Sequence, residues 1–441
     1  MKTLLPSLLT LSLTLTATGA TTRNDDSCDI APLPAATLLL PYFEVDLDDP
    51  NGTTTLFTIT NVSPRDQIAH VTLWTDRAFP VIGFNIYLTG YDVQSINLFD
   101  VIARGHIAPE RGTGTQIQKR GRYSDPNTTL DLSSCDRLPG AIDNVYVTHM
   151  TEAFTNGRIP PLGNVIPGCE NIGNVHENAV GYATIDVVRI CSTKIGNETE
   201  YWRDEVLWDN VLAGDYQQVT RASRFAEGGP LVHIRAVPEG GTSQQRRDNP
   251  AAYDAGFERT FYSRYQSAST PKLDGRQPLP STFAARWISG GSGNFQTFFK
   301  VWREGKTGAN ATCAAHTPEK DLHAREVVMF DEQENAVTGL PQCTCTFEPA
   351  PYIFPPTSLT SVADIDRYPQ HMNGAVSGWA YLNLHTPGQD EYATQAWVIS
   401  SMRAEGQFSV DMDVTALGNG CSPPAGVSEV GDGTAVIGSA Q

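Results

Sequence analysis

The fold is decided by residues 53–100, which read TTTLFTITNVSPRDQIAHVTLWTDRAFPVIGFNIYLTGYDVQSINLFD. Apolar and polar residues alternate along this stretch, as they do from Ala69 to Leu73. A period of two places one face of a strand in the core and the other face toward water. The alternation breaks at residues that suit turns: 61–64, 78–80 and 89–90. The stretch therefore predicts four consecutive antiparallel strands.

Similar short apolar or alternating runs return along the chain, at 37–45, 141–147, 180–191, 230–237, 283–289, 295–303, 326–331, 380–384, 397–399 and 408–415. Helical spacing is scarce, and the two best helix candidates are 200–212 and 358–368. We therefore expect an all-β protein with minor α content. It should consist of two antiparallel β-sandwich-like domains with long loop excursions, stapled by disulfides.

Residues 1–20, MKTLLPSLLTLSLTLTATGA, have the form of a secretory signal peptide, with Lys2, an apolar core and small residues before a polar run. A retained membrane anchor is the alternative. No later stretch approaches the roughly 20 apolar residues that a spanning helix needs. We expect no transmembrane segment and a secreted, extracellular protein, or a periplasmic one if the source is a Gram-negative bacterium.

The rest of the chain is longer than one core usually serves, so two or three domains are expected. The pattern divides it into an N-terminal β-sandwich-like domain at 21–195 with an irregular excursion at 102–175, a central, mainly β region at 196–348, a C-terminal β segment at 349–421 and a disordered tail at 422–441. The C-terminal segment either co-folds with the central region or shares one sandwich with the distant N-terminal strands.

The charge balance narrows the range of partners. The chain has 49 acidic and 31 basic residues and a formal net charge of −18. Binding to a phosphate backbone requires a basic surface, so nucleic acid is excluded as an expected partner. An acidic balance is typical of a soluble exported protein. A glycan or another extracellular surface ligand is the partner that we expect.

Eight cysteines follow the signal segment, and an even number in an exported chain indicates disulfides. Their connectivity does not follow from the sequence. A zinc cluster is the alternative, but Cys343 and Cys345 have no second close cysteine pair or paired histidine motif beside them. The disulfide candidates are Cys28, Cys135, Cys169, Cys191, Cys313, Cys343, Cys345 and Cys421.

Two segments offer ligands for a metal ion. The oxygen-rich turn with Asp46, Asp48, Asp49 and Asn51 suits Ca²⁺, although its spacing departs from the twelve-residue calcium loop. A plain hairpin turn explains the same residues. In the second segment, His316, His323 and Glu326 lie close in sequence and suit zinc or iron, with a solvated polar loop as the alternative.

Four residues are candidates for ligand binding. His233 and Arg235 point to the same side of a strand, where arginine could bind a carboxylate and histidine could act as acid or base. A solvent-facing strand, or a buried pair satisfied by aspartates, is the alternative. Trp74 and Tyr87 would stack on sugars if exposed on a sheet face, and would otherwise serve in packing.

No nucleophile elbow, His-Glu-x-x-His motif, phosphate-binding glycine loop or dinucleotide fingerprint occurs in the sequence. The pattern favours an exported, non-enzymatic β-sandwich protein with a surface, matrix, adhesion or ligand-binding role. The first alternative is an extracellular glycan-active hydrolase, because that class needs only a pair of carboxylates. The second alternative is a metal-dependent exported enzyme.

Overall fold

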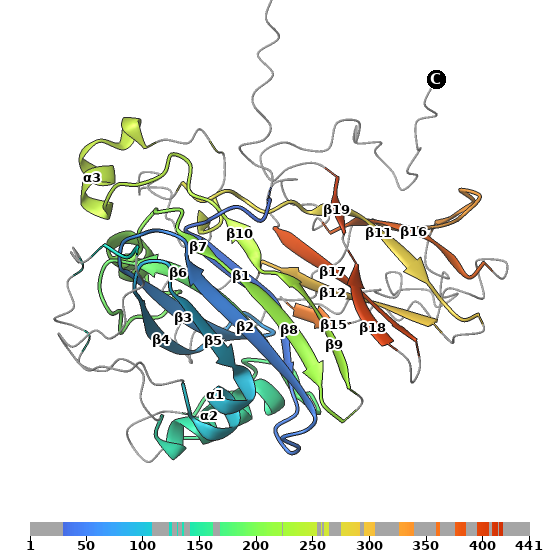
Figure 1. Cartoon of the computed structure of the whole chain (residues 1–441). Helices are drawn as coiled ribbons and strands as arrows, with labels where there is room; N and C mark the ends of the chain where they lie inside the picture. The colour runs from blue at the N-terminus through green and yellow to red at the C-terminus, as the bar shows by residue number, and fades with distance from the viewer. Residues whose placement is uncertain are drawn as a thin grey trace, which may run out of the picture.

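The computed structural model describes residues 30–107, 123–125, 130, 135, 142–161, 168–222, 224–253, 257, 260–263, 275–291, 295–304, 326–338, 359–361, 375–384, 395–404, 408–412 and 414–417. Most of these residues lie in antiparallel strands, and the helices are few and short (Figure 1). The prediction of an all-β protein with minor helix is therefore confirmed.

Two sheets form the first sandwich. The first sheet has the order β10 (Val232–Ile234), β1 (Thr37–Val45), β6 (Ala179–Val188), β3 (Gln67–Thr75) and β4 (Pro80–Leu88). The second sheet has the order β5 (Val93–Asn97), β2 (Thr53–Asn61), β8 (Asp215–Thr220) and β9 (Phe225–Pro230), and β7 (Leu212–Ala213) pairs with β2.

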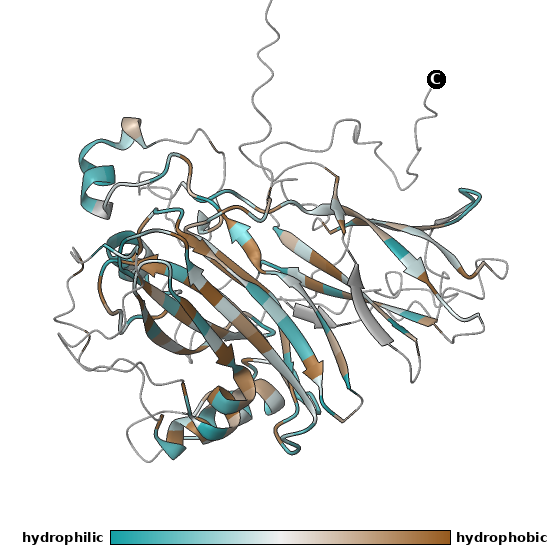
Figure 2. Ribbon diagram, in the orientation of Figure 1, coloured by the Kyte–Doolittle hydropathy of each residue, from teal (hydrophilic) through white to brown (hydrophobic). Residues whose placement is uncertain are grey.

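Apolar side chains from facing strands fill the space between these sheets. Val71 and Ile185 of the first sheet and Phe57 and Ile59 of the second belong to one buried cluster. Residues of α1 (Leu98–Arg104) and α2 (Asn144–Asn156) join the same cluster. Hydrophobic colouring is dense along β3 and β4 (Figure 2). The alternation at residues 53–100 therefore gives strands, as expected, up to Asn97, which ends β5 and caps α1.

The first sandwich continues past residue 195, where its end was expected. β8 pairs with β2, and β10 pairs with β1. Residues 212–234 thus complete both sheets of this sandwich. The local pattern predicts that a strand forms at 230–237, but it does not say which distant strand will be its partner.

Two further sheets form the second sandwich. The third sheet has the order β15 (Leu359–Ser361), β12 (Phe295–Arg303), β17 (Ala396–Ala404) and β18 (Phe408–Met412). The fourth has the order β14 (Ala336–Thr338), β13 (Glu326–Asp331), β16 (Ser377–Asn383), β11 (Thr282–Ile288) and β19 (Thr415–Ala416). Each sheet mixes strands from 196–348 with strands from 349–421, so these two segments fold together.

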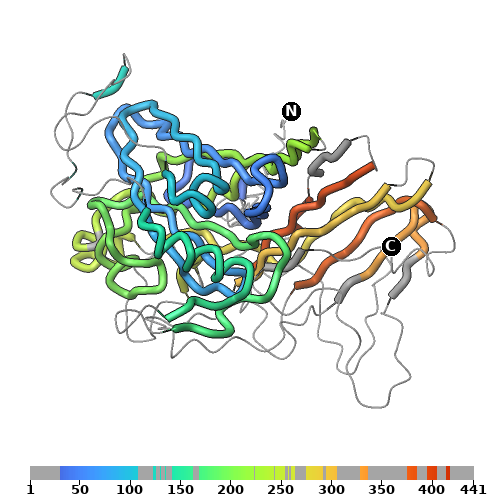
Figure 3. The backbone as a smooth tube through the Cα atoms, turned by 90° about the horizontal axis from the view of Figure 1, so that it is seen from below, coloured from blue at the N-terminus to red at the C-terminus, as the bar shows by residue number. Residues whose placement is uncertain are grey.

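The two central strands of the third sheet, β12 and β17, have buried residues on both faces. Phe299 and Val301 of β12 belong to the core of the second sandwich. Ile399 of β17 lies in the core of the first sandwich, and Trp302 of β12 lies in a cluster on the outer face of the first sheet. β9 also runs beside β18. The two sandwiches are therefore packed against each other, as Figure 3 shows from below.

Three local predictions are wrong. Residues 144–147, expected within a strand, form the first turn of α2, because Asp143 caps its N-terminus. The helix expected at 200–212 is reduced to the π-turn η2 (Tyr201–Glu205), and the chain then extends so that Val206 bridges to β6. Part of the helix expected at 358–368 is strand β15, and the remainder lies outside the described residues.

One disulfide joins Cys135, within the long excursion, to Cys191 just after β6. Cys169 is also disulfide-bonded. The other five predicted disulfide cysteines lie outside the described residues: Cys28, Cys313, Cys343, Cys345 and Cys421. The prediction of a disulfide-stapled β protein is thus confirmed in the described part of the chain. Among the described helices, which include the short α3 (Ser243–Asp248) and η3 (Pro250–Ala252), none could cross a membrane.

Candidate functional site

Polar residues on the outer face of the first sheet are covered by residues 189–205, which follow β6 and end with the turn η2, and which we call the covering segment. His70 of β3 and Asp186 of β6 lie directly opposite each other and are both about 1% exposed. The turn η2 and the residues before it cover them. Buried titratable groups are unusual in proteins, and they are often found at functional sites.

The His70 ring is held in one orientation by its neighbours. Its Nδ1 donates a hydrogen bond to Oδ1 of Asn85 at 2.8 Å, and the amide of Asn85 donates to the carbonyl of Ser192 at 2.7 Å. The ring centroid lies 5.1 Å from that of Tyr201. Burial lowers the pKa of His70, and the hydrogen bond to Asn85 opposes this shift. A neutral imidazole is therefore favoured.

Asp186 is surrounded by donors from the protein. It accepts hydrogen bonds from the hydroxyls of Thr37 at 2.5 Å, Tyr201 at 2.8 Å and Tyr262 at 2.6 Å. The guanidinium of Arg276 lies 4.0 Å away. Burial, followed by the charge of Asp186, raises the pKa of Tyr201 well above its ordinary value. The carboxylate is thus fixed by several donors and serves to bind the covering segment to the sheet.

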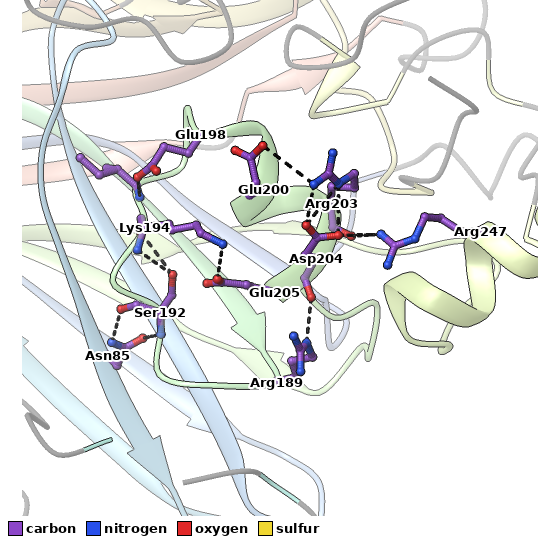
Figure 4. A network of polar contacts seen from close by, with 11 residues as sticks. Asn85, Arg189, Ser192, Lys194, Glu198, Glu200, Arg203, Asp204, Glu205 and Arg247 are labelled. Carbon is purple, nitrogen blue, oxygen red and sulfur yellow. Dashed lines mark hydrogen bonds and ion pairs between the residues drawn. The ribbon is translucent and has the colours of Figure 1, made fainter. Parts of the chain in front are cut away.

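The covering segment carries a second network, shown in Figure 4. Glu205 accepts a hydrogen bond from the Lys194 ammonium at 2.6 Å. The neighbouring Asp204 pairs with Arg203 and with Arg247 of α3, each at 2.7 Å. The hydrogen bond from Arg203 holds the pKa of Asp204 below its ordinary value. One π-turn, a feature frequent at functional sites, thus presents adjacent carboxylates to separate sets of cations.

A third polar group lies where the two sandwiches meet, and we call it the interface cluster: Glu44, Gln218, Glu227, Lys300 and Ser401. The Lys300 ammonium donates to the Glu227 carboxylate and to the Gln218 carbonyl oxygen, both at 2.6 Å. Gln218, Glu227 and Lys300 are each about 5–6% exposed. A buried ammonium is costly unless it is paired and hydrogen-bonded, as it is here.

The rest of the interface cluster completes the hydrogen bonding. Glu227 accepts a hydrogen bond from the Ser401 hydroxyl at 2.5 Å. Glu44 accepts from the Gln218 amide at 3.1 Å, from the Tyr42 hydroxyl at 2.9 Å and from the Asn178 amide at 2.6 Å. Burial, followed by the charge of Glu44, raises the pKa of Tyr42 well above its ordinary value.

His233 and Arg235, predicted to bind a ligand, lie on β10 and just beyond it. His233 is about 3% exposed, with Nδ1 2.8 Å from the carbonyl oxygen of Leu33 and Nε2 3.2 Å from that of Gly214. The backbone amide of Arg235 donates to Oε1 of Gln277 at 3.3 Å. These contacts give His233 a structural role in joining β10 to two loops.

Trp74 and Tyr87, predicted to stack on sugars, are both buried. Trp74 stacks on Tyr182 with ring centroids 5.8 Å apart, and its indole N–H donates to Thr184 at 2.9 Å. The hydroxyl of Tyr87 donates to Asp66 at 2.5 Å. The structure places both rings in packing contacts and does not bring them together with His233.

The acidic turn at 46–51 uses its carboxylates on its own backbone. Asp46 accepts from the backbone amides of Asp48 and Asp49, both at 3.0 Å, and Asp49 accepts from that of Asn51 at 2.8 Å. Within the described ranges, no group of three or more His, Cys, Asp or Glu side chains could hold a metal ion. His316 and His323 lie outside those ranges, and Glu326 begins β13.

The residues of the interface cluster were not among those predicted from the sequence. Its signal was present at residues 298–302 of β12, FFKVW, where Lys300 interrupts an otherwise aromatic and aliphatic run. A lysine in the middle of a buried strand requires a partner. Comparison with family models, with curated proteins and with solved structures found no match. Function is therefore inferred from the geometry.

Proposed function

We propose that this chain is an exported, non-enzymatic β-sandwich protein with a surface, matrix, adhesion or ligand-binding role. One observation carries the proposal: the buried carboxylates that would be the best catalytic groups are engaged by the protein's own donors. Asp186 is held by hydroxyls, and Glu205 and Glu227 are each paired with a lysine.

These pairings favour a structural role over catalysis on an external substrate. A general acid or base must reach the proton of a substrate, and a glycosidase needs two carboxyl groups facing the same sugar. Asp186 faces the covering segment, and Glu227 faces the second sandwich, so each carboxylate joins parts of the fold. A rigid body assembled in this way suits the presentation of a surface.

Export is supported by the form of residues 1–20 and by the disulfide between Cys135 and Cys191, since such bonds persist in oxidising compartments. The surface also offers apolar contact groups. Tyr91 and Val93 are 53% and 56% exposed at the start of the edge strand β5. Aromatic side chains of this kind are enriched where proteins bind glycans or other proteins.

The proposal is tested by screening the purified full-length protein for binding on a glycan array and for hydrolysis of soluble polysaccharides. We expect retention on a surface polymer without release of reducing sugar. Tyr91→Ala should weaken that retention several-fold, whereas Tyr146→Ala, a comparably exposed tyrosine on α2, should not. Turnover of a polysaccharide by the wild type, lost in Glu205→Gln or Glu227→Gln, would overturn the proposal in favour of the hydrolase.

A further inference from the structure

The interface cluster brings three reactive groups together in one buried site. The Lys300 amine lies 2.6 Å from the side-chain carbonyl oxygen of Gln218 and 2.6 Å from the Glu227 carboxylate. Gln218 and Glu227 lie directly opposite each other on β8 and β9, so the ladder fixes their relative position. Amine, carboxamide and carboxylate are the components of an acyl transfer from nitrogen to nitrogen.

We propose that Lys300 and Gln218 react within the folded chain to form an isopeptide bond, with Glu227 as the general base. The bond would tie β8 of the first sandwich to β12 of the second. This inference goes beyond the proposed function, because it concerns a covalent modification of the chain itself and does not depend on any ligand.

The orientation of the Gln218 amide is set on both sides. Its carbonyl oxygen faces the Lys300 ammonium, a donor, and its amide nitrogen donates to the Glu44 carboxylate at 3.1 Å. If the amide were flipped, its NH2 group would face the Lys300 ammonium, which is also a donor, and its oxygen would face the Glu44 carboxylate, which is also an acceptor. The electrophilic carbon is therefore presented with the oxygen toward Lys300 and the leaving nitrogen toward Glu44.

The reaction balances without any co-reactant. Glu227 accepts a proton from the Lys300 ammonium, and the lone pair on Nζ then forms a bond to Cδ of Gln218. The tetrahedral intermediate collapses as the bond from Cδ to Nε2 breaks. Nε2 takes up two protons, the second one lost by Nζ and the one held by Glu227, and leaves as ammonium. Nothing is oxidised or reduced.

The site also provides what such a reaction requires of its surroundings. Burial excludes water, which would otherwise solvate the ammonium and the carboxylate. The strands hold the amine 2.6 Å from the amide oxygen, one bond away from the carbon that it attacks, so folding brings the two reactants together. The Tyr42 ring lies 5.1 Å from Nζ and closes one side of the site. Glu44 stands at the leaving nitrogen, where it can relay the proton that ammonia needs.

The test is a peptide map of the full-length protein, purified after export, reduced, alkylated and digested with trypsin under denaturing conditions. We expect a cross-linked species that joins the peptide with Gln218 to the one with Lys300, lighter than their sum by one ammonia. Trypsin should fail to cut after Lys300. Quantitative recovery of a separate peptide ending at Lys300 would overturn the proposal, and this outcome is decided on the wild type alone.

Variants then assign the roles. The mass deficit of one ammonia should disappear in Lys300→Arg and in Glu227→Gln. It should remain in Lys194→Arg. Lys194 is the matched control, since it pairs with Glu205 at 2.6 Å but, among the described residues, donates to no carboxamide. Asn51→Ala must keep the deficit, because a succinimide at Asn51 and Gly52 would lose the same mass. A deficit that disappears in Asn51→Ala and persists in Lys300→Arg would contradict the cross-link.

Discussion

His70 shows at the scale of a single residue how burial is expected to control the response to pH. Burial lowers the pKa of His70 in the folded protein below the value of about 6.5 that an unfolded chain has. The unfolded state therefore takes up the proton first as the pH falls. The stability that the neutral ring contributes is complete above the unfolded pKa and is lost below it, toward the folded pKa.

We therefore expect the free energy of unfolding of the wild type to fall between pH 7.5 and 5.5 more steeply than that of His70→Gln. The difference in slope should reach at most about 1.4 kcal/mol per pH unit, which corresponds to one proton. Urea denaturation at several pH values measures it. Equal slopes for the two proteins would show that His70 is accessible to protons in the folded state.

Gly181 tests how closely the strands of the first sheet pack. A Cβ at this position would lie 2.4 Å from the backbone oxygen of Trp74 and 2.4 Å from the ring of Phe43. Gly181→Ala should therefore reduce the free energy of unfolding by about 1–3 kcal/mol, the usual cost of overpacking. Gly229→Ala is the control, because nothing lies within 4 Å of its added Cβ. A similar effect of both substitutions on the urea midpoint would argue against this packing.

At this scale the sequence shows which positions are polar and which are apolar, but it does not show which side chains contact one another in the fold. Lys300 is visibly out of place in its strand, yet Gln218 and Glu227 lie more than 70 residues away, as separations of 82 and 73 show. In the same way, nothing local to Trp74 says whether its ring will face water or Tyr182. Side-chain contacts of this kind follow from the pairing of distant strands.

The elements themselves depend on local signals, and α2 illustrates them. Asp143 caps its N-terminus by accepting a hydrogen bond from the amide of Val145 at 3.1 Å, and Gly157 ends it in the left-handed conformation. Asp143→Ala should lower the free energy of unfolding by about 1 kcal/mol, whereas Asp143→Asn should keep most of the cap. Thermal denaturation of both variants checks this, and equal losses would show that charge and not capping is at work.

Strands were easier to predict from the sequence than helices. The period of two at 53–100 is long and regular, and it gives β2, β3 and β4. Residues 141–147 also look like a strand, and only the pair of caps at Asp143 and Gly157 marks a helix. Residues 200–212, in contrast, were predicted to form a helix and form only the turn η2. Their aromatic residues are needed to cover the outer face of the first sheet, and this tertiary requirement overrides the helical pattern.

For the whole molecule, the interface cluster should contribute much of the coupling between the sandwiches. Lys300→Met removes the closest cation of Glu227 and leaves it the Arg403 guanidinium at 3.3 Å, so the loss should stay below the roughly 3–5 kcal/mol of a buried charge left unpaired. The double variant Lys300→Met with Glu227→Leu should be more stable than Lys300→Met, because neither protein can form the cross-link and the double variant no longer buries the Glu227 charge. Chemical denaturation measures the three proteins, and a double variant no better than the single one would contradict the pairing.

Buried charges and the third sheet, which packs against the first sandwich, are expected to make the two sandwiches one cooperative unit. Differential scanning calorimetry of the wild-type, full-length protein at neutral pH tests this expectation directly. We expect one cooperative transition, with equal calorimetric and van't Hoff enthalpies. Two separated transitions in the wild type would contradict it, because they would show that the sandwiches unfold independently of each other.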